Sequence, residues 1–259
     1  MTPQMSQGLS CPPLYKTYEK GEYRVRRYLS FIYGPYSRYT MNLQSLPLPD
    51  FFKQHYVHFQ NLTPIQEKAV QARLLEKKSL LICAPTASGK TLVASMAIAN
   101  ILGTGKVIYL VPLKALASEK GKEYQLLLQG TPYKSTIATG DIDSDSGYLA
   151  KYDLLILTTE KLDSLLRHKV SWIQEVKTVI IDEIHLLNDP SRGPTLEIIL
   201  TLLKGMIHPQ LIGLSATIGN PEDLAQWLEA ELVQDSWRPV ELKQGIRHNG
   251  LTEFYKIES

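Results

Sequence analysis

Residues 84–91, Ala-Pro-Thr-Ala-Ser-Gly-Lys-Thr, carry residue types and a spacing that bind phosphate. An apolar run at residues 80–83 precedes them, and an alanine-rich helical pattern at residues 92–102 follows. Strand, tight loop and helix in that order are the context that a phosphate-binding loop requires, because the loop N–H groups and the positive end of the new helix then face the phosphates. Lys90 would reach the β- and γ-phosphates, and the Thr91 hydroxyl would ligate Mg²⁺.

The cofactors that this loop predicts are ATP and Mg²⁺. The predicted nucleotide contacts within the loop are Pro85, Thr86, Ala87, Ser88, Gly89, Lys90 and Thr91. Ala84 stands where the usual pattern has its first glycine. For the loop taken alone, the alternative is an ordinary strand–turn–helix with a chance Gly-Lys-Thr, since short motifs give false positives.

Residues 61–70 predict a helix whose beginning is well marked. Thr63 is a fitting N-cap, Pro64 is a fitting first helical residue, and Gln66 stands three residues after the cap, where it would complete a capping box. Capping is one interpretation of Gln66. The other is that its amide reads the edge of an adenine base, and on that interpretation Gln66 joins the predicted nucleotide contacts.

Two acids, Asp182 and Glu183, follow the apolar residues 176–181. A strand with almost no polar residues is expected when both of its faces are buried, and ligands of open α/β sheets gather at the carboxyl ends of the strands. Asp182 would hold Mg²⁺ through water, and Glu183 would orient and deprotonate an attacking water. The predicted catalytic residues are therefore Glu183, Asp182 and Lys90. Acids favoured at a helix N-terminus are the alternative.

Strands and helices alternate along the chain, which predicts right-handed βαβ units and a mainly parallel sheet. The expected strands are residues 80–83, 106–112, 135–140, 153–158, 176–181 and 210–214. The expected helices after the loop are residues 92–102, 114–128, 160–167, 194–206 and 221–228. His248-Asn249-Gly250 predicts a β-hairpin near the end of the chain, because Asn-Gly is a strong hairpin signal.

Composition narrows the class of protein. The 259 residues are 44% hydrophobic and 21% charged, which is typical of a globular protein with one large or two small domains. The net charge is only +2, so a nucleic-acid site would have to be a local patch. Two cysteines are too few for a disulfide framework, and neither a membrane span nor a signal peptide is evident. We therefore expect a cytoplasmic protein with no membrane partner.

Residues 1–40 differ from the rest of the chain in composition. They hold seven of the 14 tyrosines and six Lys or Arg residues but only two acids. A basic, aromatic arm of this kind could stack on nucleic-acid bases. We favour a poorly ordered leader that precedes a start at Met41, because chain termini are usually loose.

Four features together, Gln66, residues 84–91, residues 182–185 and residues 215–217, resemble the first motor domain of a superfamily two helicase of the DExH type. The nearer resemblance is to the Ski-two-like branch, and within it to the archaeal DNA repair helicase family that works at stalled replication forks. It covers roughly residues 42–259. Further stretches that agree in order and spacing are residues 112–117, 139–141, 158–165, 182–187 and 237–240, and Arg192-Gly193 with Glu197.

The resemblance implies an α/β fold: a three-layer RecA-like P-loop domain with a mainly parallel central sheet. Residues 41–235 would form the ATP-binding domain, and residues 236–259 would begin the connection to an absent second motor domain that supplies the arginine finger. The implied function is that of a Mg²⁺-ATP-binding motor of a 3′–5′ DNA helicase, weak or inactive in unwinding on its own. Two origins of the chain stay open: it could be a truncated gene product, or it could be half of an enzyme whose second motor domain is a separate chain.

The resemblance also implies roles for residues outside the nucleotide loop. The residues expected to contact nucleic acid are Lys114, Thr139, Gly140, Thr159 and Lys161. Ser215, Thr217 and His185 would couple ATP hydrolysis to movement of the bound strand. The alternatives are solvated helix charges for the two lysines, a cap after a buried strand for residues 215–217, and a core histidine for His185.

Other classes of protein stay open at this point. One is a non-catalytic nucleic-acid-binding or regulatory module that retains a motor fold. Another is a P-loop kinase or unrelated ATPase, which Asp182-Glu183 with residues 215–217 disfavours. The expected partner is single-stranded or forked nucleic acid. The residues do not separate DNA from RNA, so an RNA helicase fragment is a further alternative, although the resemblance favours DNA.

Overall fold

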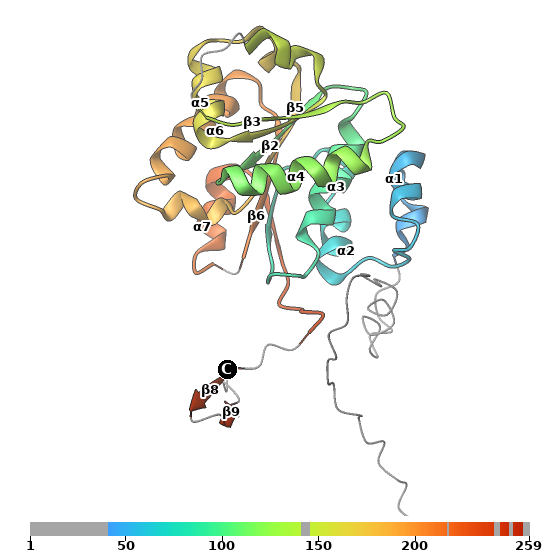
Figure 1. Cartoon of the computed structure of the whole chain (residues 1–259), viewed down its shortest axis with the longest axis vertical. Helices are drawn as coiled ribbons and strands as arrows, with labels where there is room; N and C mark the ends of the chain where they lie inside the picture. The colour runs from blue at the N-terminus through green and yellow to red at the C-terminus, as the bar shows by residue number, and fades with distance from the viewer. Residues whose placement is uncertain (1–40, 141–145, 217, 241–243, 249–250, 256–259) are drawn as a thin grey trace, which may run out of the picture. The chain divides into compact units, whose positions relative to one another are not determined.

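Seven strands form a sheet in which every pairing is parallel. This computed structural model describes residues 41–140, 146–216, 218–240, 244–248 and 251–255. The strands are β1 (Leu80–Cys83), β2 (Lys106–Val111), β3 (Ser135–Ala138), β4 (Leu154–Thr158), β5 (Val176–Ile181), β6 (Gln210–Ser215) and β7 (Glu231–Gln234). Their order across the sheet is β3-β4-β2-β5-β6-β1-β7. Figure 1 labels β2, β3, β5 and β6 of this sheet. The predicted parallel α/β fold is confirmed.

Seven α-helices accompany these strands in the described part of the chain. They are α1 (Asp50–His55), α2 (Pro64–Gln71), α3 (Lys90–Ile101), α4 (Lys114–Leu127), α5 (Thr159–Arg167), α6 (Gly193–Met206) and α7 (Pro221–Leu228). The predicted helices end within a few residues of these bounds, because amphipathic periodicity and turn residues are local signals.

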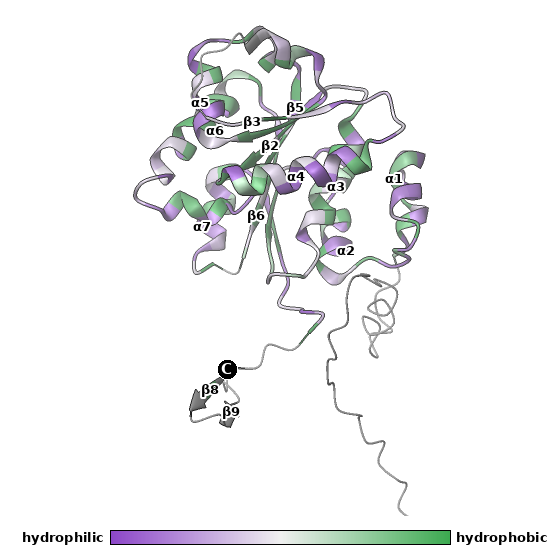
Figure 2. Ribbon diagram, in the orientation of Figure 1, coloured by the Kyte–Doolittle hydropathy of each residue, from purple (hydrophilic) through white to green (hydrophobic). Residues whose placement is uncertain are grey.

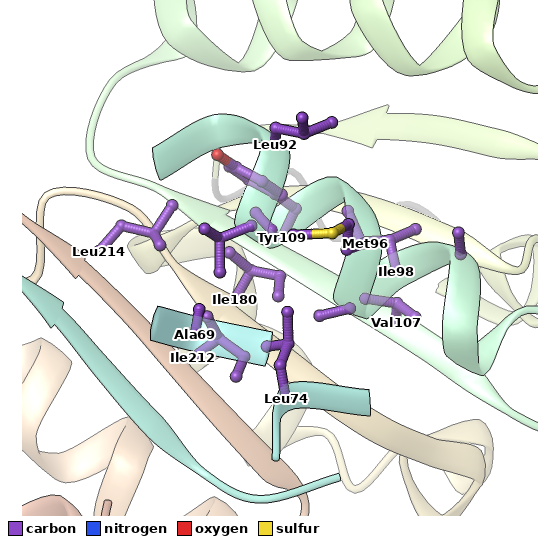
Figure 3. Packing of buried hydrophobic residues seen from close by; sticks show 14 of the residues in the cluster. Ala69, Leu74, Leu92, Met96, Ile98, Val107, Tyr109, Ile180, Ile212 and Leu214 are labelled. Atoms are coloured by element: carbon purple, nitrogen blue, oxygen red, sulfur yellow. The ribbon is translucent and has the colours of Figure 1, made fainter. Parts of the chain in front are cut away.

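Two buried clusters, one on each face of the sheet, make the fold three layers deep. Along β2, Val107, Tyr109 and Val111 belong to one cluster, and Ile108 and Leu110 belong to the other. This alternation arises because successive side chains of a strand point to opposite faces. Helices α1 to α4 contribute to the first cluster and α5 to α7 to the second. Figure 3 shows part of the first cluster, where side chains of α3 meet those of the strands.

Hydropathy along the ribbon follows the same layering. The strands are hydrophobic over most of their length, whereas the helices alternate between hydrophilic and hydrophobic residues (Figure 2). β1, β2, β4 and β6 are buried throughout. Burying a large apolar side chain stabilises a fold by about 1.5–3 kcal/mol relative to leaving it exposed. The central strands therefore anchor the sheet edge at which the predicted site residues stand.

Strand β7 is a feature that the sequence pattern did not predict. It has four residues, and only Val233 among them is buried. A short edge strand with one buried residue gives almost no periodic signal. Its pairing with β1 places residues 231–234 next to the strand that leads into the phosphate loop.

The predicted C-terminal hairpin is present as β8 (Gln244–His248) and β9 (Leu251–Tyr255), which pair antiparallel. The predicted leader at residues 1–40 and Thr217 lie outside the described residues. The predicted domain boundaries stay a prediction. None of the helices in the described part of the chain combines the length and apolar character needed to cross a bilayer.

Candidate functional site

Apart from Gln66, which lies on α2, the predicted site residues stand at or shortly after the ends of six neighbouring strands. Because the strands are parallel, all of their carboxyl ends lie at one edge of the sheet. The predicted nucleotide residues other than Gln66, and the predicted coupling residues, stand at the ends of β5, β6 and β1, which are neighbours in the sheet. The predicted nucleic-acid residues follow β3, β4 and β2, which are also adjacent. The strand order thus divides this edge into two parts, called here the nucleotide half and the nucleic-acid half after the roles predicted for their residues. The chain order does not show this division.

In the nucleotide half, the phosphate loop connects β1 to α3. Gly89 adopts a φ of +100° immediately before the helix, and Ala87 adopts a φ of +66°. Lys90 Nζ donates to the carbonyl oxygens of Ala84, at 2.5 Å, and Pro85, at 3.0 Å. The ammonium group therefore lies inside its own loop, at the place where the first N–H groups of α3 lack intrahelical acceptors.

Charges of three side chains meet at this loop. Burial lowers the pKa of the Lys90 ammonium, and the nearby carboxylates of Glu183 and Asp182 act in the opposite direction. The sequence-predicted catalytic residues Lys90, Asp182 and Glu183 are thus brought together from β1 and β5. Such a grouping of a cation with two carboxylates is what binding of a metal–phosphate complex requires.

Gln66 contacts the phosphate loop from α2. Its side chain is 4% exposed, its Oε1 accepts from the Thr63 N–H at 2.9 Å, and its Nε2 donates to the Gly89 carbonyl at 3.0 Å. Thr63 Oγ1 donates to the Ser88 carbonyl at 2.9 Å. The capping box is confirmed. The structure also adds a brace between the box and the loop, while adenine recognition by Gln66 stays a prediction.

Asp182 and Glu183 stand at the end of β5, as predicted. Asp182 Oδ2 accepts from the Tyr109 hydroxyl at 2.9 Å, and Asp182 Oδ1 accepts from the Glu183 N–H at 3.1 Å. Glu183 adopts a φ of +50°, a rare conformation for a non-glycine residue that is typical of functional sites. Sequence reasoning missed Tyr109, which resembles any other aromatic residue of an apolar strand.

His185 connects the carboxylates with β6. Its Nδ1 lies 3.3 Å from Glu183 Oε2 and 3.5 Å from Ser215 Oγ. The Ser215 carbonyl accepts from the Ala84 N–H at 3.2 Å, so the end of β6 also holds the start of the phosphate loop. His185 and Ser215 are therefore placed between the carboxylates and the loop, where a coupling role is feasible.

The donor groups of this site suit Mg²⁺ with a nucleotide. Hydroxyl and carboxylate oxygens, here those of Thr91 and Asp182, are the hard ligands that Mg²⁺ takes alongside substrate phosphates. Ser88 Oγ in the loop is buried and has no hydrogen-bond partner among the described residues. Within the residues that the structure describes, no group of three or more His, Cys, Asp or Glu side chains could hold a metal by itself. The residues present thus fit a metal that is bound together with phosphate.

The predicted residues of the nucleic-acid half differ in how far they are exposed to solvent. Lys114 is exposed, and its Nζ lies 3.6 Å from the position that a Cβ on Gly140 would take. Thr139 is half-buried, and Thr159 is buried beneath the surface. Lys161 is only 6% exposed and interacts with another group of the protein. The structure therefore brings Lys114, Thr139 and Gly140 to the surface of this half and keeps Thr159 and Lys161 inside.

Comparison with protein families gives a match over most of the described chain. The model of the DEAD/DEAH box helicases matches residues 63–224. The matched range includes every predicted site residue, from Gln66 to Thr217.

Several proteins are similar in sequence, and the three described below all bear the name ATP-dependent DNA helicase Hel308. The protein of Methanocaldococcus jannaschii is 54% identical over 205 residues, which cover 76% of this chain and 17% of that protein. The protein of Pyrococcus abyssi is 52% identical over a stretch that covers 74% of this chain and 27% of that protein. The protein of Caldivirga maquilingensis is 45% identical over a stretch that covers 83% of this chain and 29% of that protein. This chain thus spans less than a third of the length of these relatives.

Solved structures with a similar fold include the DUF1998 helicase MrfA. The crystal structure of MrfA bound to DNA superposes with a TM-score of 0.61 at 25% identity. The superposition covers 73% of this chain and 30% of the MrfA chain. A second crystal structure of MrfA superposes with a TM-score of 0.63 at 26% identity.

Proposed function

Since the chain belongs to the DEAD/DEAH box helicase family, we propose that it binds Mg²⁺-ATP and acts as the first motor domain of an ATP-dependent DNA helicase. The observation that carries this proposal is that Lys90, in the loop after β1, lies within electrostatic range of Asp182 and Glu183, which follow β5. A cradle for phosphate, a carboxylate for a metal and a group that orients water are the parts that phosphoryl transfer needs.

Each part of the loop has a defined task in this proposal. The backbone N–H groups of residues 85–91 cradle the phosphates at the positive end of α3. Lys90 exchanges its carbonyl acceptors, Ala84 and Pro85, for the β- and γ-phosphate oxygens. Thr91 and Asp182 hold Mg²⁺, which when bound neutralises charge on those oxygens. Gln66 contacts the adenine edge while it braces Gly89.

Glu183 is the proposed general base. Its carboxylate lies beside His185 and is partly exposed, so that it can orient an attacking water and accept its proton. His185 and Ser215, with Thr217 next to them in the chain, would report the state of the nucleotide to the rest of the domain. A change at Glu183 would move His185 first, because the two side chains are in contact.

Single-stranded or forked DNA is the proposed partner. Lys114, Thr139 and Gly140 offer a surface next to the nucleotide half, and Lys114 adds a cation for a phosphate of the strand. Thr159 and Lys161 stay in the proposal as residues that would contact the strand after a local rearrangement. The name of the relatives, ATP-dependent DNA helicase, supports DNA as the partner. A polarity of 3′ to 5′ is part of the proposal only through the family resemblance of the sequence motifs.

A second RecA-like domain would complete the site. The transition state of phosphoryl transfer spreads charge over the γ-phosphate oxygens, and an arginine finger contributes about 10³–10⁵ in rate in NTPases. We propose that this group comes from a second motor domain, whether in the same protein or in a partner chain. The chain of 259 residues alone should bind ATP, bind single strands weakly and fail to unwind a duplex.

The test compares Lys90→Ala with Lys122→Ala in titrations with a fluorescent ATP analogue. Lys122 is an exposed lysine of α4, so its loss should leave affinity unchanged. Lys90→Ala should abolish binding without unfolding the chain, because Lys90 is a half-buried ligand and not part of the core. Wild-type affinity in a folded Lys90→Ala protein would refute the nucleotide site. Robust displacement of a 3′-tailed duplex by this chain alone would refute the need for a second domain.

A further inference from the structure

A buried tyrosine hydroxyl contacts the proposed metal carboxylate. Tyr109 on β2 is fully buried, and its hydroxyl donates to Asp182 Oδ2 across 2.9 Å. The two residues are 73 positions apart in the chain and come from adjacent strands. Figure 3 shows Tyr109 within the buried cluster that also contains Met96 and Ile180.

Packing alone does not account for the hydroxyl of Tyr109. A phenylalanine would fill the same space, whereas a buried hydroxyl lowers stability unless it finds a partner. The only acceptor that the hydrogen bonds of the described residues show for this hydroxyl is Asp182. A tyrosine phenol is protonated at neutral pH, so this hydroxyl is available as a donor there.

The ring of Tyr109 is held in turn by a second tyrosine. The ring centroids of Tyr109 and Tyr124 lie 5.4 Å apart, and the Tyr124 hydroxyl lies 3.3 Å from Ser95 Oγ. Ser95 Oγ donates to the Thr91 carbonyl at 3.0 Å. The same buried cluster therefore touches the backbone of Thr91 and the carboxylate of Asp182, the two proposed metal ligands.

The two hydrogen bonds to Asp182 leave room for a metal. An ionised carboxylate has about four lone-pair sites. One bond from Tyr109 reaches Oδ2 and one from the Glu183 N–H reaches Oδ1, so the plane of the carboxylate is set while a lone pair on each oxygen remains. A carboxylate oriented in advance loses less entropy when it binds a metal or a metal-bound water.

We propose that Tyr109 is a positioning residue that orients the Asp182 carboxylate for Mg²⁺. This inference rests on the proposed function, in which Asp182 holds the metal. Hydrogen-bond partners of metal-ligating carboxylates typically change metal affinity by about 10–100-fold when removed. The effect of Tyr109 should therefore appear in the Mg²⁺ dependence of nucleotide binding and not in nucleotide binding as such.

The experiment titrates Mg²⁺ into the full chain with a fluorescent ATP analogue and repeats the nucleotide titration in EDTA. Tyr109→Phe removes only the hydroxyl that reaches Asp182. Tyr124→Phe is the matched control, because it removes the same atom from a neighbouring, equally buried tyrosine that does not bond to Asp182. We expect Tyr109→Phe to raise the half-saturating Mg²⁺ concentration about tenfold or more, and Tyr124→Phe to leave it within about twofold of wild type. Affinity in EDTA should be the same in all three proteins.

A third variant separates this inference from the function on which it rests. Asp182→Asn should raise the Mg²⁺ requirement at least as much as Tyr109→Phe. If Asp182→Asn has no effect, the metal role of Asp182 is wrong and the premise fails. If Asp182→Asn shifts the Mg²⁺ requirement but Tyr109→Phe behaves like Tyr124→Phe, only the positioning role is overturned. An equal loss of affinity with and without Mg²⁺ in Tyr109→Phe would also overturn it, because that pattern indicates a distorted loop.

Discussion

The Nε2 group of Gln66 donates a hydrogen bond to the carbonyl oxygen of Gly89 across 3.0 Å, and it occupies the space that a side chain at Gly89 would need. A Cβ on Gly89 would lie 2.2 Å from this nitrogen, and the φ of +100° at Gly89 is itself unfavourable for other residues. The glutamine and the glycine thus depend on each other. Through this amide, and through the bond from Thr63 Oγ1 to the Ser88 carbonyl, the start of helix α2 holds the phosphate loop in its conformation.

Gln66→Ala should therefore affect stability and nucleotide binding together. The substitution leaves the partly buried Thr63 N–H and Gly89 carbonyl without their partner, at a cost of up to about 1–3 kcal/mol. Urea denaturation would measure this cost, and an ATP titration would measure the loss of affinity. Gln71→Ala is the control, since Gln71 is an exposed glutamine of the same helix. Equal stability of the two variants would contradict the brace.

Glu183→Gln should separate binding from turnover. The amide keeps the shape of the side chain but cannot accept a proton from water. Loss of a general base typically costs about 10²–10⁴ in rate, so single-turnover hydrolysis with single-stranded DNA should slow by that factor while ATP affinity is retained. Glu119→Gln, an exposed acid of α4, should change neither quantity. Hydrolysis by Glu183→Gln at the wild-type rate would rule out Glu183 as the base.

Two glycines of α6 should respond in opposite ways to alanine. A Cβ on Gly193 would lie 2.1 Å from the Leu187 carbonyl oxygen, which is backbone and cannot move away freely. Gly205 has nothing within 4 Å of its Cβ position. Gly193→Ala should therefore lower the melting temperature by several degrees. Gly205→Ala should raise it slightly, because alanine favours a helix by about 0.5–1 kcal/mol. Thermal unfolding followed by circular dichroism measures both melting temperatures. An unchanged melting temperature in Gly193→Ala would show that the backbone at Leu187 moves away from the new Cβ at no cost in stability.

Asp189 should make stability depend on pH in acid. Its carboxylate accepts from Ser191 Oγ, the Ser191 N–H and the Arg192 N–H, and these bonds lower its pKa from 3.8 to about 2. A carboxyl whose pKa is lower in the folded state contributes stability above its unfolded pKa, and this contribution is lost as pH falls through the folded value. The difference in melting temperature between wild type and Asp189→Ala should thus be largest above about pH 5 and should decrease toward zero near pH 2.

A partial variant sharpens the pH test. Ser191→Ala removes one donor and keeps the two backbone N–H groups, so its pH-dependent loss should be smaller than that of Asp189→Ala. A gap that stays constant from pH 5 to pH 2 would mean that the Asp189 carboxylate gains nothing from these hydrogen bonds in the folded chain.

The sequence by itself determined the features that depend on neighbouring residues. The capping box of Thr63 and Gln66, the loop that ends in Lys90 and Thr91, and the acids after β5 were all predicted, because caps, tight loops and strand ends are set within a few residues. The alternation of strands and helices likewise predicted a parallel sheet. Strand β7 was missed because its four residues bury only Val233 and leave no period to detect.

Only the tertiary structure decided which of these features meet. Continuous apolar strands indicate that both faces are covered, but they do not say which strands are neighbours, so the order β3-β4-β2-β5-β6-β1-β7 could not be predicted. That order divides the carboxyl edge into its nucleotide and nucleic-acid halves. It also brings the Tyr109 hydroxyl to Asp182, and the packing of α5 buries Lys161, which the sequence had suggested as a surface cation. Contacts between residues far apart in the chain arise from how the layers pack, and no local pattern of residue types records that packing.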